Sequence, residues 1–272
     1  MRVAGLDIDD ARPIPAGDIC QAWQGTVSGR SVFAKTLRDP PPGFFAAEAR
    51  GLALIAVAGG PPVPGVVGVG DDGLVLDWVE PGAPTRAIAE IFGHRLATMH
   101  ATVLPDFGGS ADGFIGSLPL PNATRPSWSR FYVEQRILPY VAALSNVERR
   151  AIERVCESID EIAGPPEPPA RIHGDLWSGN LLWGADGAAW LVDAAGAHGG
   201  HRETDLAMLQ LFGAPHLEVI LSAYQEISPL ADGWQHRVQL HQLHPLLVHT
   251  TLFGGGYGAR AAAAAASAIG GG

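Results

Sequence analysis

The most informative stretch of this sequence is His173-Gly174-Asp175-Leu176-Trp177-Ser178-Gly179-Asn180, which is followed at a short distance by Leu191-Val192-Asp193. Phosphoryl transfer from ATP needs few parts from a protein. A carboxylate positions or deprotonates the attacking hydroxyl, oxygen ligands hold Mg²⁺, and a cation holds the phosphates. The two acids and the amide of this stretch can supply the first two of these parts.

The spacing of these polar residues is that of the protein-kinase scheme, in which an Asp is followed by an Asn and, beyond a short hairpin, by a second Asp. Asp175, Asn180 and Asp193 reproduce this order, with His-Gly-Asp where protein kinases have His-Arg-Asp. A polar loop between strands can contain such a pair by chance. The flanking His-Gly, the apolar run after Asn180 and the position of Asp193 favour the kinase interpretation. We therefore predict Asp175 as the catalytic base and Asn180 and Asp193 as ligands of Mg²⁺.

The first 80 residues have the pattern of a β-rich unit with one helix. Two short runs separated by Ser28-Gly29 predict a hairpin. Apolar residues at helical spacing predict a helix further on, which ends at a proline-rich segment. We expect strands at Gln21–Val27, Arg30–Thr36, 65–70 and 74–79 and a helix at 44–58.

Pro81-Gly82-Ala83-Pro84 is the strongest boundary signal in the chain. It divides a β-rich, ATP-binding N-lobe at 1–80 from a helical, catalytic and substrate-binding C-lobe at 81–272. The fold class we predict is therefore α+β, with two lobes like those of a protein kinase. In the second lobe we expect helices at 85–102, 127–144 and 145–162, the last with a Ser145/Glu148 capping box, one hairpin at 180–192, and a frayed Gly- and Ala-rich tail.

Composition excludes several classes of protein. Of the 272 residues, 47% are apolar and 17% charged, which is typical of a globular chain rather than a disordered one. The formal charge of −10 argues against nucleic-acid binding, and the apolar stretches are too short or too interrupted to span a membrane. Two cysteines are too few for a disulfide framework, and we expect no secretory signal. A cytoplasmic location is the resulting expectation.

With these residues in view, 173–180 resembles the signature of the fructosamine/ketosamine kinase family, relatives of aminoglycoside and choline kinases. Blocks at 107–136, 199–213 and 234–257 are also similar to that family, so the resemblance covers nearly the whole chain. It implies a protein-kinase-like fold and ATP-dependent phosphorylation of the 3-hydroxyl of a ketosamine, either a small molecule or a glycated protein. The product would be unstable and release the amine, which implies a role in deglycation repair.

The resemblance also implies a nucleotide site in the N-lobe. Lys35, at the end of an apolar strand, resembles the lysine that contacts ATP phosphates, and Glu48 would pair with it. The alternatives are a solvated lysine and an exposed helix glutamate. Backbone groups of Asp77, Trp78 and Val79 would bind adenine. The expected phosphate loop at 16–19 has only one glycine, and we interpret the neighbouring Cys20 as a half-buried thiol without a redox role.

Several residues of the second lobe have two interpretations each. Trp177 could stack on the sugar or the amine, or pack in the core. His201, Arg202 and Glu203 could face the substrate or form an ion-pair network. Asp205 resembles an aspartate that supports the catalytic loop through backbone hydrogen bonds. Four further histidines lack metal-ligand spacing, so we expect them to pack in the C-lobe: His236, His241, His244 and His249.

Two rival functions remain open at this point. The chain could be a kinase of the same fold that acts on an aminoglycoside, choline or another sugar. It could instead be an ATP-binding pseudokinase, although the intact set of Asp175, Asn180 and Asp193 argues against that. The sequence carries no indication of the oligomeric state.

Overall fold

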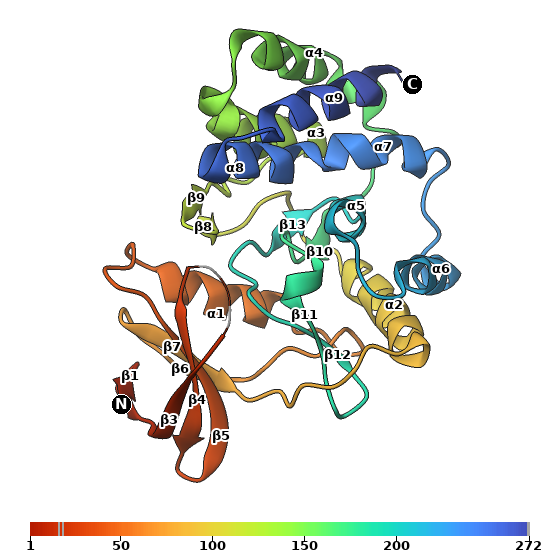
Figure 1. The fold of residues 1–272 in the computed structure, drawn as a ribbon. Helices are drawn as coiled ribbons and strands as arrows, with labels where there is room; N and C mark the ends of the chain where they lie inside the picture. The colour runs from red at the N-terminus through yellow and green to blue at the C-terminus, as the bar shows by residue number, and fades with distance from the viewer. Residues whose placement is uncertain (16, 18, 271–272) are drawn as a thin grey trace.

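The N-terminal part is built on an antiparallel sheet, seen in a computed structural model that describes residues 1–15, 17 and 19–270 (Figure 1). A small hairpin of β1 (Arg2–Val3) and β2 (Leu6–Asp7) precedes it. The hairpin between β4 and β5 has the predicted bounds, and its turn residues Ser28 and Gly29 have φ angles of 50° and 80°, as expected for the turn that matches strand twist. The five strands lie in the order β3 (Asp9–Ile14), β4 (Gln21–Val27), β5 (Arg30–Thr36), β7 (Gly73–Asp77) and β6 (Val66–Val69).

A single helix, α1 (Phe44–Ile55), connects β5 to β6 and packs against β6 and β7. Phe45, Leu52 and Ile55 are its buried apolar residues, and they belong to the same core as the β7 residues Leu74 and Leu76. The spacing of these side chains puts them on one face of the helix, which the sequence predicted. Helix α1 is therefore fixed relative to the sheet that carries Lys35.

The connection between the two parts runs from the end of the sheet to α2 (Arg86–His100), so the predicted boundary at residue 80 falls within it. Thr85 caps α2, because its hydroxyl accepts a hydrogen bond from the Ile88 N–H at 3.3 Å. Pro81 in this connection pairs with Gly184, in the turn of the hairpin formed by β11 (Leu181–Trp183) and β12 (Ala189–Leu191). The connection thus lies against the segment that links Asn180 to Asp193.

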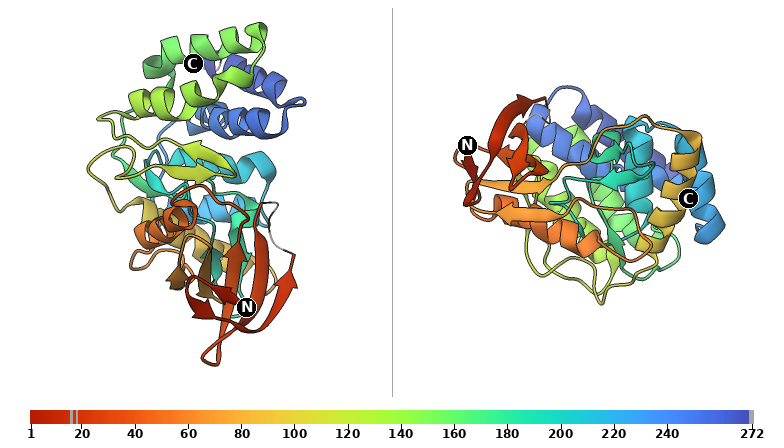
Figure 2. Two further views of the ribbon diagram at one scale, coloured as in Figure 1. Left: turned by 90° about the vertical axis from the view of Figure 1, so that its left-hand side faces the viewer. Right: turned by 90° about the horizontal axis from the view of Figure 1, so that it is seen from below.

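The rest of the molecule is mainly helical, with two more short antiparallel pairs (Figures 1 and 2). The capping box predicted at the start of α4 is present, with both Ser145–Glu148 hydrogen bonds. Helices α2 and α6 pack together beside the hairpin, and α4, α7, α8 and α9 form a second layer around their own core. The remaining elements are β8 (Gly113–Ile115) with β9 (Leu118–Leu120), β10 (Ala170–Ile172) with β13 (His198–Gly200), α4 (Asn146–Ile162), α5 (Glu203–Phe212), α6 (Leu217–Ile227), α7 (Trp234–His241), α8 (Leu243–Phe253) and α9 (Tyr257–Gly270). None of the helices among the described residues is long and apolar enough to cross a membrane.

Two expectations about helices need correction. The segment predicted as one helix at 127–144 is a short α3 (Trp128–Phe131) followed by a π-helical and then a 3₁₀-helical part, Tyr132–Ile137 and Leu138–Ala143. Pro139 accounts for the change, because it has no N–H to continue the α-helical bonds. The alanine-rich tail is not frayed but forms α9, whose Ala261, Ala264, Ala265 and Ala268 are buried against α4, α7 and α8. Alanine has the highest helix propensity, and its small side chain allows close helix packing.

Candidate active site

The loop between β10 and β11 holds Asp175 and Asn180 in direct contact. The Asn180 side-chain Nδ2 donates hydrogen bonds to the backbone oxygen of Asp175 at 2.8 Å and to its carboxylate Oδ2 at 3.3 Å. Asn180 is buried at the end of the short 3₁₀ turn Ser178–Asn180. Because its nitrogen is used in this way, its Oδ1 is the atom that is free to point towards a ligand.

Asp205 holds the backbone of this loop by hydrogen bonds, as expected. Its carboxylate accepts hydrogen bonds from the backbone N–H groups of His173 at 2.7 Å and Gly174 at 2.9 Å. His100 Nε2 lies 3.2 Å from the same carboxylate. Burial alone would raise the pKa of Asp205, but the hydrogen bonds and the neighbouring histidines hold it below its ordinary value. The Asp205 carboxylate is therefore ionised, and it fixes the backbone of the two residues that precede Asp175.

Lys35 on β5 meets two carboxylates from distant parts of the chain. It forms an ion pair with Glu48 of α1, and its Nζ lies 2.9 Å from Asp193 Oδ1. Lys35 and Glu48 are both buried, whereas the Asp193 side chain is 56% exposed. The predicted Lys35–Glu48 pair is confirmed, and the alternative of a solvated lysine is wrong. The Lys35–Asp193 contact joins the sheet to the segment that follows β12.

The electrostatics of this cluster follow from burial and charge. Burial would lower the pKa of Lys35, but Glu48 and Asp193 together raise it, so the ammonium keeps its charge. Burial raises the pKa of Glu48 to about 7 against the opposing effect of Lys35. Lys35 holds the pKa of Asp193 below its ordinary value. Burial, together with the negative charge of Asp193, raises the pKa of Asp175 to about 8.

Gly51 allows α1 to pack closely against the segment that follows Asp193, a contact that was not predicted from the sequence. A Cβ at Gly51 would overlap the backbone carbonyl oxygen of Ala194. Only glycine allows the helix to approach so closely, and this approach keeps Glu48, three residues earlier, within reach of Lys35. A glycine in the middle of a predicted helix, which costs helix stability, was the available signal.

The proposed adenine-binding segment at the end of β7 already uses part of its backbone. The Asp77 N–H donates to the Gly65 oxygen at 2.9 Å, and the Trp78 N–H donates to the Ser31 oxygen at 3.2 Å. Of the expected phosphate loop, Ala16 and Asp18 lie outside the described residues. Cys20, next to it, is a half-buried free thiol, and burial raises its pKa. A raised pKa leaves a smaller fraction of the thiol in the reactive thiolate form.

Arg202 and Glu203 form ion pairs that are buried or partly buried, and His201 is buried beside them, which favours the second interpretation over substrate contact. Glu203 Oε1 and Oε2 accept hydrogen bonds from Arg237 at 2.6 and 2.9 Å. Arg202 makes a two-fold contact with Glu167, with both distances 2.7 Å. Arg237 and Glu167, the charged partners, were not identified from the sequence, because each lies in a segment distant from the 201–203 run.

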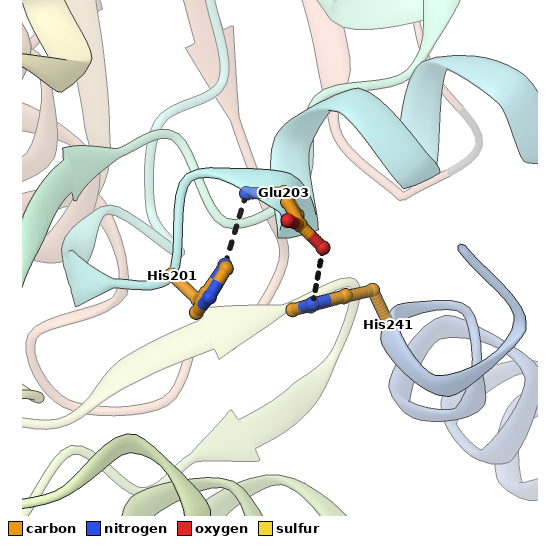
Figure 3. Close-up of side chains that lie close together, drawn as sticks. All are labelled: His201, Glu203 and His241. Atoms are coloured by element: carbon orange, nitrogen blue, oxygen red, sulfur yellow. Dashed lines mark hydrogen bonds and ion pairs between the residues drawn. The ribbon is translucent and has the colours of Figure 1, made fainter. Parts of the chain in front are cut away.

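Figure 3 shows the centre of this network, where His201, Glu203 and His241 bring possible metal-ligating atoms within 4.8 Å of one another. Figure 3 also shows Glu203 contacting His241, with a distance of 3.4 Å between Oε2 and Nε2. The guanidinium of Arg237 already occupies both carboxylate oxygens and would repel a cation. Burial lowers the pKa of His201 well below its ordinary value, so this ring is neutral. We interpret the group as a structural ion-pair cluster.

A cavity of about 360 Å³ lies on another side of α1. It is lined by one face of that helix, including Arg50 and Leu54, and by the segment from Leu104 to Gly113. It does not include Asp175, Asn180, Lys35 or Asp193, and convergent chemistry identifies a site better than volume does. The candidate active site is therefore the region where Lys35 and Glu48 meet Asp193 and the loop that carries Asp175 and Asn180.

Comparison with known proteins agrees with this geometry. A model of the family described as fructosamine kinase matches residues 2–269. A probable ketoamine kinase of Thermus thermophilus is 36% identical over 94% of both chains, and one of Enterococcus faecium is 33% identical over 91% of both chains.

Among solved structures, a candidate fructosamine-3-kinase from Thermobifida fusca superposes with a TM-score of 0.92 and 44% identity, covering 98% of this chain and 95% of the other. The aminoglycoside phosphotransferase APH(4)-Ia has a TM-score of 0.66 at 14% identity, covering 96% of this chain and 94% of its own, and so shares the fold alone. The fold is therefore the kinase-like fold of phosphotransferases. The chain belongs to the fructosamine kinase family.

Proposed function

We propose that this protein transfers the γ-phosphoryl group of ATP to the 3-hydroxyl of a ketosamine, such as an erythrulose, ribulose or fructose adduct of an amine. The observation that carries the proposal is the convergence of Lys35, Asp193 and Glu48 beside the Asp175–Asn180 pair. These groups supply the cation, the oxygen ligands and the base that phosphoryl transfer requires. The family and its probable ketoamine kinases support the choice of substrate.

Each residue has a distinct role in this proposal. Asp175 orients the sugar hydroxyl and accepts its proton. Lys35, held by Glu48, contacts the phosphates of ATP. The carbonyl groups of Asp77 and Trp78, together with the backbone of Val79, bind adenine, because two N–H groups of this segment are already engaged. Trp177, an exposed residue of the same loop as Asp175, contacts the substrate.

Asn180 and Asp193 fit a magnesium ion. Asn180 Oδ1 is left free by the bonds of its amide nitrogen, and Asp193 keeps one carboxylate oxygen outside its contact with Lys35. Such hard oxygen donors, with water completing the shell, are what Mg²⁺ prefers. Magnesium supplies charge neutralisation at the phosphate oxygens when bound.

The division into a nucleotide lobe at 1–80 and a catalytic lobe at 81–272 follows from these roles. The free cysteines Cys20 and Cys156 support a reducing, cytoplasmic compartment.

A coupled ADP-release assay tests the function. The purified protein is given Mg²⁺–ATP with fructose, ribulose or erythrulose adducts of one amine, and with choline and an aminoglycoside as counter-substrates. We expect turnover of at least one ketosamine, loss of turnover in EDTA, and recovery with Mg²⁺ or Mn²⁺. Turnover of choline or the aminoglycoside alone would retain the mechanism and reject the substrate. The absence of any turnover, with ATP still bound, would favour the pseudokinase. Full activity after rigorous chelation would reject the roles of Asn180 and Asp193.

A further inference from the structure

Five aromatic rings form a connected surface that begins at the catalytic loop. The ring centroids of Trp177 and Phe212 are 6.1 Å apart, those of Phe212 and His249 are 5.1 Å apart, and His249 lies 5.4 Å from Phe253 and 5.0 Å from Tyr257. All of these spacings fall in the range of interacting aromatic pairs. We call these five residues the aromatic strip.

The strip is exposed to a degree that core packing does not explain. Trp177 is 40% exposed, Phe212 37% and Phe253 63%. Single exposed apolar residues are common, but large rings that gather from separate segments into one exposed surface indicate a binding site. Here they come from the catalytic loop, the end of α5, helix α8 and the first residue of α9.

Two of the rings are held in place by local contacts. A Cβ at Gly179 would overlap the indole of Trp177, so the indole lies directly on the loop backbone at that glycine. The Nδ1 of His249 lies 2.7 Å from the backbone oxygen of Pro245, and because a carbonyl only accepts, this nitrogen donates. These contacts reduce the entropy lost when a ligand binds to the rings.

The strip also begins next to the candidate base in the chain. Trp177 follows Asp175 by two residues, so a substrate with its hydroxyl at Asp175 would have its remainder beside the indole. At the other end, Leu252 precedes Phe253, and a Cβ at Gly116, in the turn between β8 and β9, would lie 3.2 Å from Leu252 and 3.4 Å from Ile19. Ile19 belongs to the segment that leads to Cys20 and β4. The residue that precedes Phe253 therefore lies near the turn that approaches Ile19, and Figure 1 shows β8 and β9 between α8 and the N-terminal lobe.

We propose that the aromatic strip binds the amine-derived part of the ketosamine, and that Phe212 and Phe253 favour amines that carry an aromatic or other flat apolar group. The inference rests on the proposed function, because the amine is covalently attached to the sugar at Asp175. The ketosamine nitrogen is a basic secondary amine, and its cation is attracted to the face of an aromatic ring. Beyond that nitrogen, an aromatic group would stack on Phe212 and Phe253, whereas a methyl group would not reach them.

The test compares two ribulose adducts that share the sugar and differ in the amine, one made from phenethylamine and one from methylamine. Kinetics are measured for the wild type, Phe253→Ala, Phe212→Ala and the control Ile227→Ala. Ile227 is 55% exposed and lies at the end of α6, so it matches Phe253 as an exposed apolar residue outside the strip. We expect each strip variant to raise KM for the phenethylamine adduct about tenfold, with kcat and the methylamine adduct nearly unchanged.

Other outcomes separate this inference from the proposed function. Failure of the wild type to phosphorylate either adduct rejects the proposed function, and the inference with it. Turnover of both adducts with no preference in the wild type, or with equal losses in the strip variants, rejects the inference alone. Light scattering of the wild type and Phe253→Ala tests a second copy of the chain as the occupant. A dimer that dissociates in the variant, without a change in substrate preference, would assign the strip to self-association and overturn the inference.

Discussion

Two ion-pair clusters among the described residues differ in how far they are open to solvent. In the helical part, Arg237 occupies both oxygens of Glu203, and the whole group is buried. At the candidate active site, Lys35 is shared between Glu48 and Asp193, and the Asp193 side chain remains 56% exposed. Asp193 also has a φ angle of 59°, a left-handed conformation that costs about 1–3 kcal/mol for a residue other than glycine. In the closed cluster the Glu203 carboxylate is paired within the protein, whereas in the open one an exposed carboxylate lies in a left-handed conformation, which supports the proposed ligand site.

The largest effect should come from neutralising the base beside the open cluster. Asp175→Asn keeps the shape of the side chain and removes its ability to accept the hydroxyl proton, so we expect kcat to fall about 10²–10⁴-fold. ATP affinity, measured by calorimetry, should change much less, because other residues hold the phosphates. Loss of both together would make Asp175 a structural or metal-binding residue, and full activity would refute its role as base.

Breaking the closed cluster should affect stability instead of chemistry. Arg237→Met leaves Glu203 buried without its partner, which costs about 3–5 kcal/mol in comparable cases. Urea unfolding should show this loss, while kcat per folded molecule stays near the wild-type value. A large fall in kcat with unchanged stability would place this cluster in the active site and restore the substrate-contact interpretation of Glu203.

Removing the cation of the open cluster should give the reverse pattern. Lys35→Met removes the proposed phosphate contact, and we expect kcat/KM to fall about 10²–10³-fold. Stability should change little, because burial already raises the pKa of Glu48 to about 7, so this carboxyl can take up a proton once Lys35 is absent. Near-normal kcat/KM in the variant would mean that a different cation, Arg30 or Arg38, serves the phosphates.

The smallest effect expected is the acid sensitivity of the closed cluster. Burial opposes ionisation of Glu203, but the neighbouring His241 and the hydrogen bonds that Arg237 donates to it lower its pKa from 4.5 to about 2. A lowered folded-state pKa gives stability that is present above pH 4.5 and is lost as the pH falls towards 2. The difference corresponds to at most about 3 kcal/mol. The free energy of unfolding, measured in urea at pH 6 and at pH 3, should fall less between these pH values in Glu203→Gln than in the wild type. An equal fall in both proteins would contradict the assignment.

The parts of the molecule that the sequence predicted well are those in which spacing alone specifies the contacts. Asp175 and Asn180 meet within one loop, and the β4–β5 hairpin is defined by its turn residues. The Lys35–Glu48 pair could be predicted because the two residues lie on a strand and on the helix that follows it, and consecutive elements often pack together. In each case the partners are close in sequence or belong to consecutive elements.

The parts that could not be predicted depend on tertiary packing. The alanine-rich tail becomes an ordered helix only because α4, α7 and α8 provide a surface against which small side chains pack. Arg237 and Glu203 are 34 residues apart and meet through the packing of α5 on α7. The aromatic strip likewise joins four segments. No local pattern in the sequence specifies which of these distant residues become neighbours.

The close approach of Gly51 to the Ala194 carbonyl has a consequence for control of the enzyme. Protein kinases are switched by displacing the helix that carries the glutamate of the ion pair. Here that helix is bonded to the other lobe at several points, since Arg50 donates to the Asp112 oxygen at 3.1 Å and Arg171 donates to the Leu54 oxygen at 2.7 Å. Swinging the helix outward would break all of these contacts at once. The Lys35–Glu48 pair is therefore formed while α1 stays bonded to the second lobe, so this pair needs no helix movement to assemble.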